Sequence, residues 1–258
     1  MKKILCLFGA LALSLTSCSS DDNSSDPGTA NALPTKITET IVENGKSGSL
    51  DYTFTYDGNK LKQISLSDAS KSVYTYTGDL ITKVESYKSG VLFSTDVYAY
   101  ENGKLISKIT TNAFNATSQE KLTFVYNANG TVNVNQSEII NKQEIKYDTT
   151  TLYTFANGNM ISSEYYDGVK EKITSTFDDK KSPFVNITGL KLLLDLDNEF
   201  DFYSTNNALT SVTVTYDGEG KVVQTASVDF KNKYNASNFL SEVFAGDAND
   251  SFKIQITY

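Results

Sequence analysis

The chain has 258 residues, a formal net charge of −8 and a mean hydropathy of −0.31. It contains no His and no Arg, so all 23 basic residues are lysines. Without His, the usual general base near neutral pH and the commonest zinc ligand are missing. Without Arg, there is no bidentate fork for phosphate or guanine. A chain of this charge is repelled by nucleic acid, so we expect no nucleic-acid partner.

The first residues have the pattern of a secretory signal. Lys2 and Lys3 precede an apolar run over residues 4–15. This run is too short to cross a bilayer, which needs about 20 residues. The stretch LTSC that ends at Cys18 resembles the lipobox of bacterial lipoproteins. The resemblance implies a signal peptide over residues 1–17 and acylation of Cys18, which anchors the chain by lipid without a transmembrane helix. An ordinary cleaved signal with a chance cysteine is the alternative.

A polar stretch follows the cysteine. Residues 19–34 are small and apolar-poor, so they cannot bury enough surface to fold, and we predict a flexible stalk over residues 18–35. An Asp directly after the lipidated cysteine resembles a signal that retains lipoproteins in the inner membrane. This chain has Ser19 at that position, which favours the outer membrane. The Ser-Asp-Asp stretch 20–22 resembles the tag of Gram-negative lipoproteins that face the cell surface, although a plain acidic linker has the same composition. Loss of Lys2 and Lys3 with the signal makes the net charge −10.

The remaining residues, 36–258, are expected to form one β domain built from repeated hairpins. The first copy, YTFTYDGNKLKQI at 52–64, has two alternating stretches on either side of Asp57-Gly58. Asp-Gly and Asn-Gly between such stretches predict two-residue turns, which need positive φ. The glycines therefore have a structural role at the turns, and since no helix follows them they do not fit a phosphate-binding loop. The predicted turn glycines are Gly58, Gly78, Gly103, Gly130, Gly158 and Gly218.

Strict alternation predicts an antiparallel sheet with one aromatic face and one wet face. We count about 14 strands, more than an open twisted sheet usually holds, so the all-β meander should curl into a barrel-like or flattened sheet. A porin-type barrel carries its apolar face outward. Here the polar face is rich in lysine, so the apolar face should turn inward. The lysines assigned to the outer face are Lys60, Lys62, Lys83, Lys108, Lys121 and Lys146.

One segment, residues 178–207, breaks the pattern. A short helix with one apolar face fits within 187–197, formed by Ile187, Leu190, Leu193 and Leu194, and we interpret it as a cap or plug on the sheet. Its acidic run offers Asp195, Asp197 and Asp201 as calcium ligands, but it lacks the glycine that bends an EF-hand loop, and an ordinary solvated strand face has the same pattern. Asp178 and Asp179 are a possible acid–base pair, although a turn explains two adjacent carboxylates better. We expect no metal and no cofactor.

The repeats carry a resemblance. The pattern YTYDxxGxL, seen in 52–61 and 214–223, resembles the YD repeats of large bacterial shell proteins of the RHS type. The lipobox, stalk, hairpins and the stretches FDDKKSPF (177–184) and STNNALTSVTVTYDGEG (204–220) together resemble a family of bacterial lipoproteins of unknown function with a porin-like fold. Several repeats replace the YD aspartate with Thr77, Glu101 or Asn127. The resemblance implies a fold and an outer-membrane location, and it carries no activity.

Three functions follow from this composition. The first is a non-enzymatic, monomeric scaffold that binds a glycan, a peptide or an envelope partner. The second is a purely structural envelope component, and the third is a carboxylate-dependent glycosidase. Exposed tyrosines that line an open groove would favour binding, whereas tyrosines sealed in a core would favour a structural role.

Overall fold

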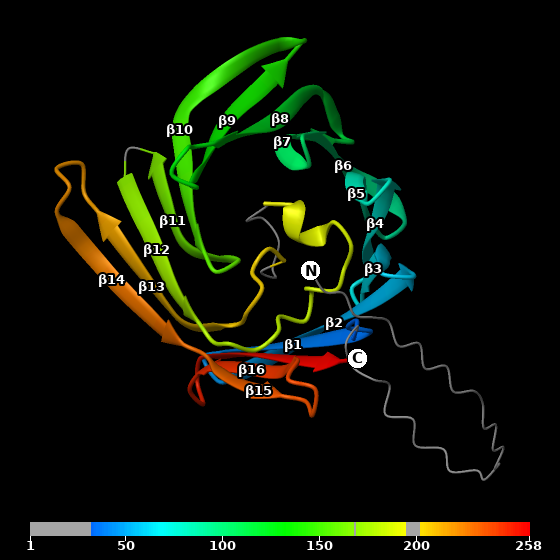
Figure 1. Ribbon diagram of the computed structural model, residues 1–258, viewed down its shortest axis with the longest axis vertical. Coiled ribbons are helices and arrows are strands. Elements are labelled where there is room, and N and C mark those ends of the chain that lie inside the picture. The colour runs from blue at the N-terminus through cyan, green and yellow to red at the C-terminus, as the bar shows by residue number, and fades with distance from the viewer. Residues whose placement is uncertain (1–31, 168, 195–201) are drawn as a thin grey trace, which may run out of the picture.

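The computed structural model describes residues 32–167, 169–194 and 202–258. It is a 17-stranded antiparallel sheet that curls into a nearly closed barrel (Figure 1). The strands are β1 (Lys36–Glu43), β2 (Lys46–Asp57), β3 (Lys60–Leu66), β4 (Ser70–Thr77), β5 (Leu80–Lys88), β6 (Val91–Glu101), β7 (Lys104–Asn112), β8 (Asn115–Tyr126), β9 (Val132–Ile140), β10 (Gln143–Ala156), β11 (Asn159–Asp167), β12 (Val169–Phe177), β13 (Ala208–Tyr216), β14 (Val222–Asp229), β15 (Lys231–Tyr234), β16 (Leu240–Gly246) and β17 (Ser251–Thr257). The all-β meander is confirmed. The sequence predicts fewer strands than the 17 observed, because short or fully solvated strands such as β15 and β14 lack clear alternation.

Consecutive strands form the wall. Each strand from β1 to β13 pairs with the next one, and β17 returns to pair with β1 through Lys36↔Thr257. β14 continues through Phe230 into β15, but β14 pairs with β13 whereas β15 pairs with β16. Among the described residues, none pairs with the other edge of β14. We call this interruption in the ladder the seam.

Most of the predicted turn glycines take the positive φ that tight hairpin turns require. At the β6–β7 turn, Asn102 and Gly103 have φ of 51° and 74°, as a type I′ turn requires. Gly58, Gly78, Gly130 and Gly158 also lie at positive φ. Gly218 does lie in the sixth turn, but Gly220, at a φ of 81°, takes the left-handed conformation there. There Asp217 closes a longer turn by accepting backbone N–H groups from Glu219 and Lys221, which moves the strained position two residues along.

A bulge after each of the β2–β3, β4–β5 and β6–β7 turns shifts the alternation by one residue. The register slips between Thr55 and Tyr56, between Thr75 and Tyr76, and between Ala99 and Tyr100. At each bulge, two residues of the strand after the turn lie opposite one residue of the strand before it. Residues three apart in the later strand therefore share the inner face. The resulting inward pairs are Leu61 and Ile64, Ile81 and Val84, and Leu105 and Lys108.

The prediction that Lys108 lies on the outer face is therefore wrong. Its side chain is 6% exposed, and it lies opposite the buried Tyr98. The bulge places it where the preceding repeats have Ile64 and Val84. Other lysines do form outer-wall ion pairs, such as Lys83 with Glu85 at 3.0 Å and Lys121 with Glu144 at 2.9 Å.

The segment between β12 and β13 plugs one end of the barrel, as predicted. Its described parts, 178–194 and 202–207, bury Leu190 and Leu193 and set the ring of Phe184 edge-on to that of Phe202 at 4.8 Å. The plug bonds to three hairpin turns of the wall: Thr188 N–H to Asn59 C=O (2.9 Å), Thr205 N–H to Gly158 C=O (3.1 Å) and Lys181 N–H to Asn238 C=O (3.3 Å). These turns define the plug end of the barrel.

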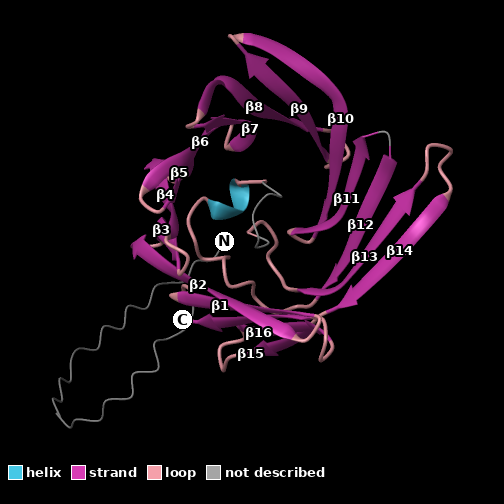
Figure 2. Ribbon diagram, turned by 180° about the vertical axis from the view of Figure 1, so that it is seen from behind, coloured by secondary structure: helices cyan, strands magenta, loops and turns pink. Residues whose placement is uncertain are grey.

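The predicted helix is shorter than expected. Only a 3₁₀ turn, η2 (Leu190–Leu192), forms in its described part, and residues 195–197 of the predicted range lie outside the described residues. Gly189 precedes the turn at a φ of 75°, so Ile187 and Leu190 cannot belong to one continuous helix. Figure 2 shows this turn inside the ring of strands.

The folded domain begins earlier than the predicted boundary at Lys36. Pro34 is fully buried, and its carbonyl accepts a hydrogen bond of 2.7 Å from the Tyr56 hydroxyl. The carbonyl of Ala32 accepts one of 3.0 Å from the Asn186 side chain, which belongs to the plug. Residues 32–35 are thus part of the fold and not of the stalk.

Candidate ligand-binding site

Sixteen tyrosines occur in the chain, and all lie in the described part. Only three of them are exposed: Tyr147 at 43%, Tyr165 at 40% and Tyr166 at 55%. All three line the same open depression of about 660 Å³, together with Gln136, Asp148, Thr149 and Asp167. We call this depression the tyrosine cleft.

The cleft continues into the barrel. Gln136, Thr149 and Tyr165 also line an adjoining cavity of about 280 Å³. The inner residues of that cavity are Lys108, Thr110, Glu120, Leu122, Val134, Thr151 and Tyr153. The combined groove therefore leads from exposed aromatic rings to a buried lysine and a carboxylate.

Tyr147 is placed by an irregularity in β10. The register of β10 against β9 shifts between Lys146 and Thr150, and such a shift redirects side chains near a rim. The Tyr147 hydroxyl donates to Glu138 Oε2 at 2.6 Å, and the Ser118 hydroxyl donates to the other oxygen of Glu138. These two bonds fix the orientation of the Tyr147 ring.

Tyr165 and Tyr166 end β11. Because they are adjacent in a strand, their side chains point to opposite faces. Tyr165 lies opposite Thr151 and Glu171, and its hydroxyl donates to Asp167 Oδ2 at 3.3 Å. Both rings line the tyrosine cleft, and Tyr165 also lines the adjoining cavity.

The protonation states follow from these contacts. The bond to Glu138 raises the pKa of the Tyr147 phenol, and the donors Ser118 and Tyr147 hold the pKa of Glu138 below its usual value. Partial burial, and then the Asp167 carboxylate, raise the pKa of Tyr165. At neutral pH the Tyr147 and Tyr165 phenols are therefore neutral, and the Glu138 carboxylate that Tyr147 contacts is ionised.

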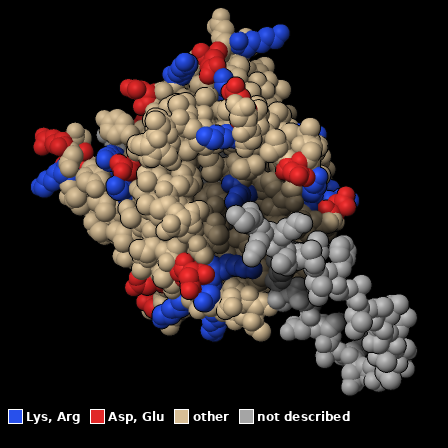
Figure 3. Space-filling model, in the orientation of Figure 1, with Lys and Arg blue, Asp and Glu red and all other residues tan. Residues whose placement is uncertain are grey.

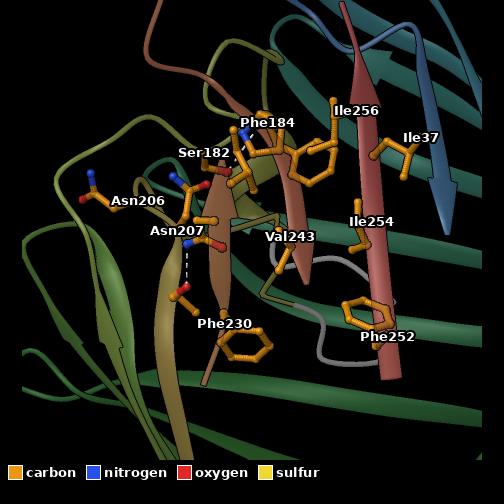
Figure 4. A pocket seen from close by; sticks show the side chains of 14 residues that line it. Ile37, Ser182, Phe184, Asn206, Asn207, Phe230, Val243, Phe252, Ile254 and Ile256 are labelled. Carbon is orange, nitrogen blue, oxygen red and sulfur yellow. Dashed lines mark hydrogen bonds between the residues drawn. The ribbon is translucent and has the colours of Figure 1, made fainter. Parts of the chain in front are cut away.

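A second pocket is mainly apolar. It has a volume of about 300 Å³ and lies between the plug and strands β15–β17. Figure 4 shows Ile254, Ile256 and Phe252 of β17 facing Phe184 and Asn207 across this space. Its wall holds few polar groups, so it can bury a small apolar body but offers little to fix its orientation.

The candidate acid–base pair does not come together. The Asp178 carboxylate accepts hydrogen bonds from the Tyr234 hydroxyl and from the Asn207 backbone, so it holds the base of the plug. Asp179 points to solvent, with 86% of its side chain exposed. The two adjacent carboxylates therefore diverge, as the turn interpretation requires.

Four of the predicted site residues are not among the residues that the structure describes. Cys18 and the calcium candidates Asp195, Asp197 and Asp201 fall outside the described residues. Within residues 32–167, 169–194 and 202–258, no three His, Cys, Asp or Glu side chains gather as a metal site would require. In the same ranges, no helix has the length and hydropathy needed to cross a membrane.

Only weak signals for the cleft are present in the sequence. The adjacent tyrosines 165–166 before Asp167 must place one ring on each face, and Lys108 replaces the apolar residue of the earlier repeats. Strict alternation instead suggested that Tyr147 belongs to the core, together with Tyr153. The shift within β10 is not evident from the residues alone.

Charged side chains do not form a patch of one sign on the face shown in Figure 3. Lysines and carboxylates are interspersed around its edge, with uncharged surface between them. On this face, therefore, no field of one sign would draw in a polyanion.

No protein-family model and no curated protein sequence matches the chain. Among solved structures, the chain is similar to a porin-like protein from Bacteroides uniformis, with 10% identity and a TM-score of 0.49 over 87% of this chain and 97% of that one. A protein of unknown function from Bacteroides fragilis aligns at 9% identity and a TM-score of 0.14, over 81% of this chain and 91% of that one.

Proposed function

We propose that this protein is a lipid-anchored outer-membrane lipoprotein, facing the cell surface, whose barrel binds a neutral glycan in the tyrosine cleft without transforming it. The observation that carries the proposal is that the three exposed tyrosines, out of sixteen, line one cleft. A sugar ring has an apolar C–H face and a rim of hydroxyls. An amphipathic tyrosine ring suits the face, and carboxylates and amides suit the rim.

The charges in the groove favour a neutral sugar. Glu120, Asp148 and Asp167 line it, against the one buried cation of Lys108. A uronic acid or a sulfated sugar would add negative charge to a chain whose net charge is already −8. Ionised carboxylates accept hydrogen bonds from neutral hydroxyls instead.

A purely structural role is the second candidate. It agrees with the buried Tyr52, Tyr98 and Tyr153, which pack in the core. It does not account for three exposed aromatic rings gathered at one rim. Binding is therefore the better-supported function.

Isothermal titration of the mature chain with neutral and acidic oligosaccharides tests the proposal. We expect a neutral oligosaccharide to bind, and Tyr165→Ala and Tyr166→Ala each to weaken its affinity by roughly tenfold or more. Tyr87→Ala is the matched control, because Tyr87 lies on β5, away from the cleft. Binding that no cleft substitution alters would overturn the proposal, as would hydrolysis of the sugar that is lost when one Asp or Glu is replaced.

A further inference from the structure

One buried polar atom in the wall of the apolar pocket has no hydrogen-bond partner. The atom is Oδ1 of Asn232, which lies on β15 opposite Val243 of β16 and lines the pocket with Val243 and Phe230 (Figure 4). It is shielded from solvent, and within residues 32–167, 169–194 and 202–258 no protein group donates to it. Buried side-chain acceptors are normally paired, so this one points to a donor that the described residues do not supply.

The neighbours of Asn232 identify this atom as an oxygen. The other end of the amide lies 2.9 Å from the carbonyl oxygen of Ala208. A carbonyl only accepts hydrogen bonds, so the amide nitrogen must face Ala208 and the amide oxygen must take the unpaired position. The hydroxyl of Tyr234, two residues along, donates its single proton to Asp178 and has none left for Asn232.

The rest of the wall selects against a charged ligand. The pocket is partly open, most of its described lining residues are apolar, and none of them is charged. The amide nitrogens of Asn206 and Asn207, which also line it, already donate to the Lys180 carbonyl at 2.9 and 3.2 Å. A charged ligand would lose its hydration here without gaining a partner of opposite charge, so the pocket favours a neutral one.

The volume of the pocket sets the size of the apolar body. An engineered apolar cavity of about 150 Å³ binds benzene, so a pocket of about 300 Å³ suits roughly two fused rings or an aliphatic body of that size. Water alone suits this space poorly, because each buried water needs roughly two to four polar partners and the described wall supplies few.

We propose that this pocket binds a neutral, mainly apolar molecule of about two rings, whose single hydroxyl donates a hydrogen bond to Asn232 Oδ1. The hydroxyl belongs to a phenol or an alcohol. An amine would be ionised at neutral pH, and a ketone or an ether has no proton to donate. The pocket shares no lining residue with the tyrosine cleft or its adjoining cavity, so it is a second site, separate from the proposed glycan site.

Two probes of nearly the same shape test the hydrogen bond: 2-naphthol, which can donate a proton, and 2-methylnaphthalene, which cannot. Burying a hydroxyl without a partner is unfavourable, so a purely apolar pocket would bind the hydrocarbon more tightly. We expect the opposite order, with 2-naphthol bound roughly tenfold more tightly in equilibrium dialysis of the full chain. A chain that binds neither probe, or that binds the hydrocarbon at least as tightly, would overturn the proposal.

Asn232→Leu removes the acceptor but keeps a side chain of similar size, so the preference for 2-naphthol should vanish or reverse. Both probes are measured on the same variant, so a change in its stability does not alter the ratio of their affinities.

Val243→Phe fills the pocket and should weaken the binding of both probes by roughly tenfold or more. The matched control is Val125→Phe, at an exposed position of β8, which should leave both affinities unchanged. A preference that survives Asn232→Leu, or binding that Val243→Phe does not reduce, would refute the site. Tyr165→Ala should leave probe binding intact, so failure of this proposal and failure of the proposed glycan binding are distinguishable.

Discussion

The hydroxyl of Tyr76 donates a hydrogen bond to the carbonyl oxygen of Thr188 at 3.2 Å and so joins the barrel wall to the plug. The same hydroxyl accepts the Leu61 N–H at 3.0 Å. One side chain thus connects two strands and the segment that fills the barrel end.

Tyr76→Phe keeps the ring but leaves the Leu61 N–H and the Thr188 carbonyl without this partner. We expect a loss of about 1–3 kcal/mol in the free energy of unfolding, measured by urea denaturation. Tyr87→Phe is the control, because no described residue hydrogen-bonds to the Tyr87 hydroxyl. Equal stability of the two variants would show that the Tyr76 hydroxyl does not hold the plug.

Gly103→Val should destabilise the protein by more than about 1 kcal/mol, because β-branched residues are disfavoured at positive φ. Gly103 has a φ of 74° and no atom within 4 Å of an added Cβ, so the cost comes from the backbone alone. Gly218 has equally open surroundings without positive φ. Gly218→Val should therefore leave the melting temperature nearly unchanged, and a similar drop in both variants would contradict the turn assignment.

Alkaline pH should unfold the protein. Burial raises the pKa of Tyr76 and of Tyr234 to about 12, and it also raises the pKa of Tyr56, Tyr100 and Tyr258. The unfolded chain ionises its tyrosines near pH 10, so the stabilisation is fully present below about pH 10 and is lost as the pH rises through the folded-state values. The urea midpoint should fall steadily above about pH 10. A midpoint that stays constant up to pH 12 would mean that these hydroxyls are not desolvated.

The mature amino terminus should carry acyl chains on Cys18, as the stretch LTSC predicts. Mass spectrometry of the protein isolated from membranes measures the modification directly. Cys18→Ala should release the chain from the membrane fraction, since one lipidated residue supplies the anchor. An unmodified Cys18 in the mature chain would show that the signal is an ordinary cleaved one.

The fold was largely predictable because its signals are local. Alternation over YTFTY and the glycine at position 58 specify a hairpin without reference to the rest of the chain, although the two turn residues are Gly58 and Asn59 and not Asp57 and Gly58. Repeating that unit specifies an antiparallel meander, and the break at residues 178–207 marks the plug. The boundary at Lys36 was set too late because Pro34 and Ala32 become part of the fold only through Tyr56 and Asn186.

The candidate site was not predictable to the same degree. Lys108 reaches the interior because a bulge shifts the alternation after Leu105, and Tyr147 reaches the rim because β10 slips against β9. Bulges arise from how two strands fit together, so the residues of one strand do not reveal them.

The sequence by itself determined the hairpins, most of their turns, the inward aromatic rows and the exclusion of imidazole chemistry, because these depend on residue type and on neighbours in the chain. Only the tertiary structure decided where the barrel stays open. The seam forms where one continuous strand changes partners at Phe230, and the tyrosine cleft forms where β9, β10 and β11 bring Gln136, Tyr147 and Tyr165 together. Both depend on contacts between segments distant along the chain, which hairpin-scale patterns do not encode.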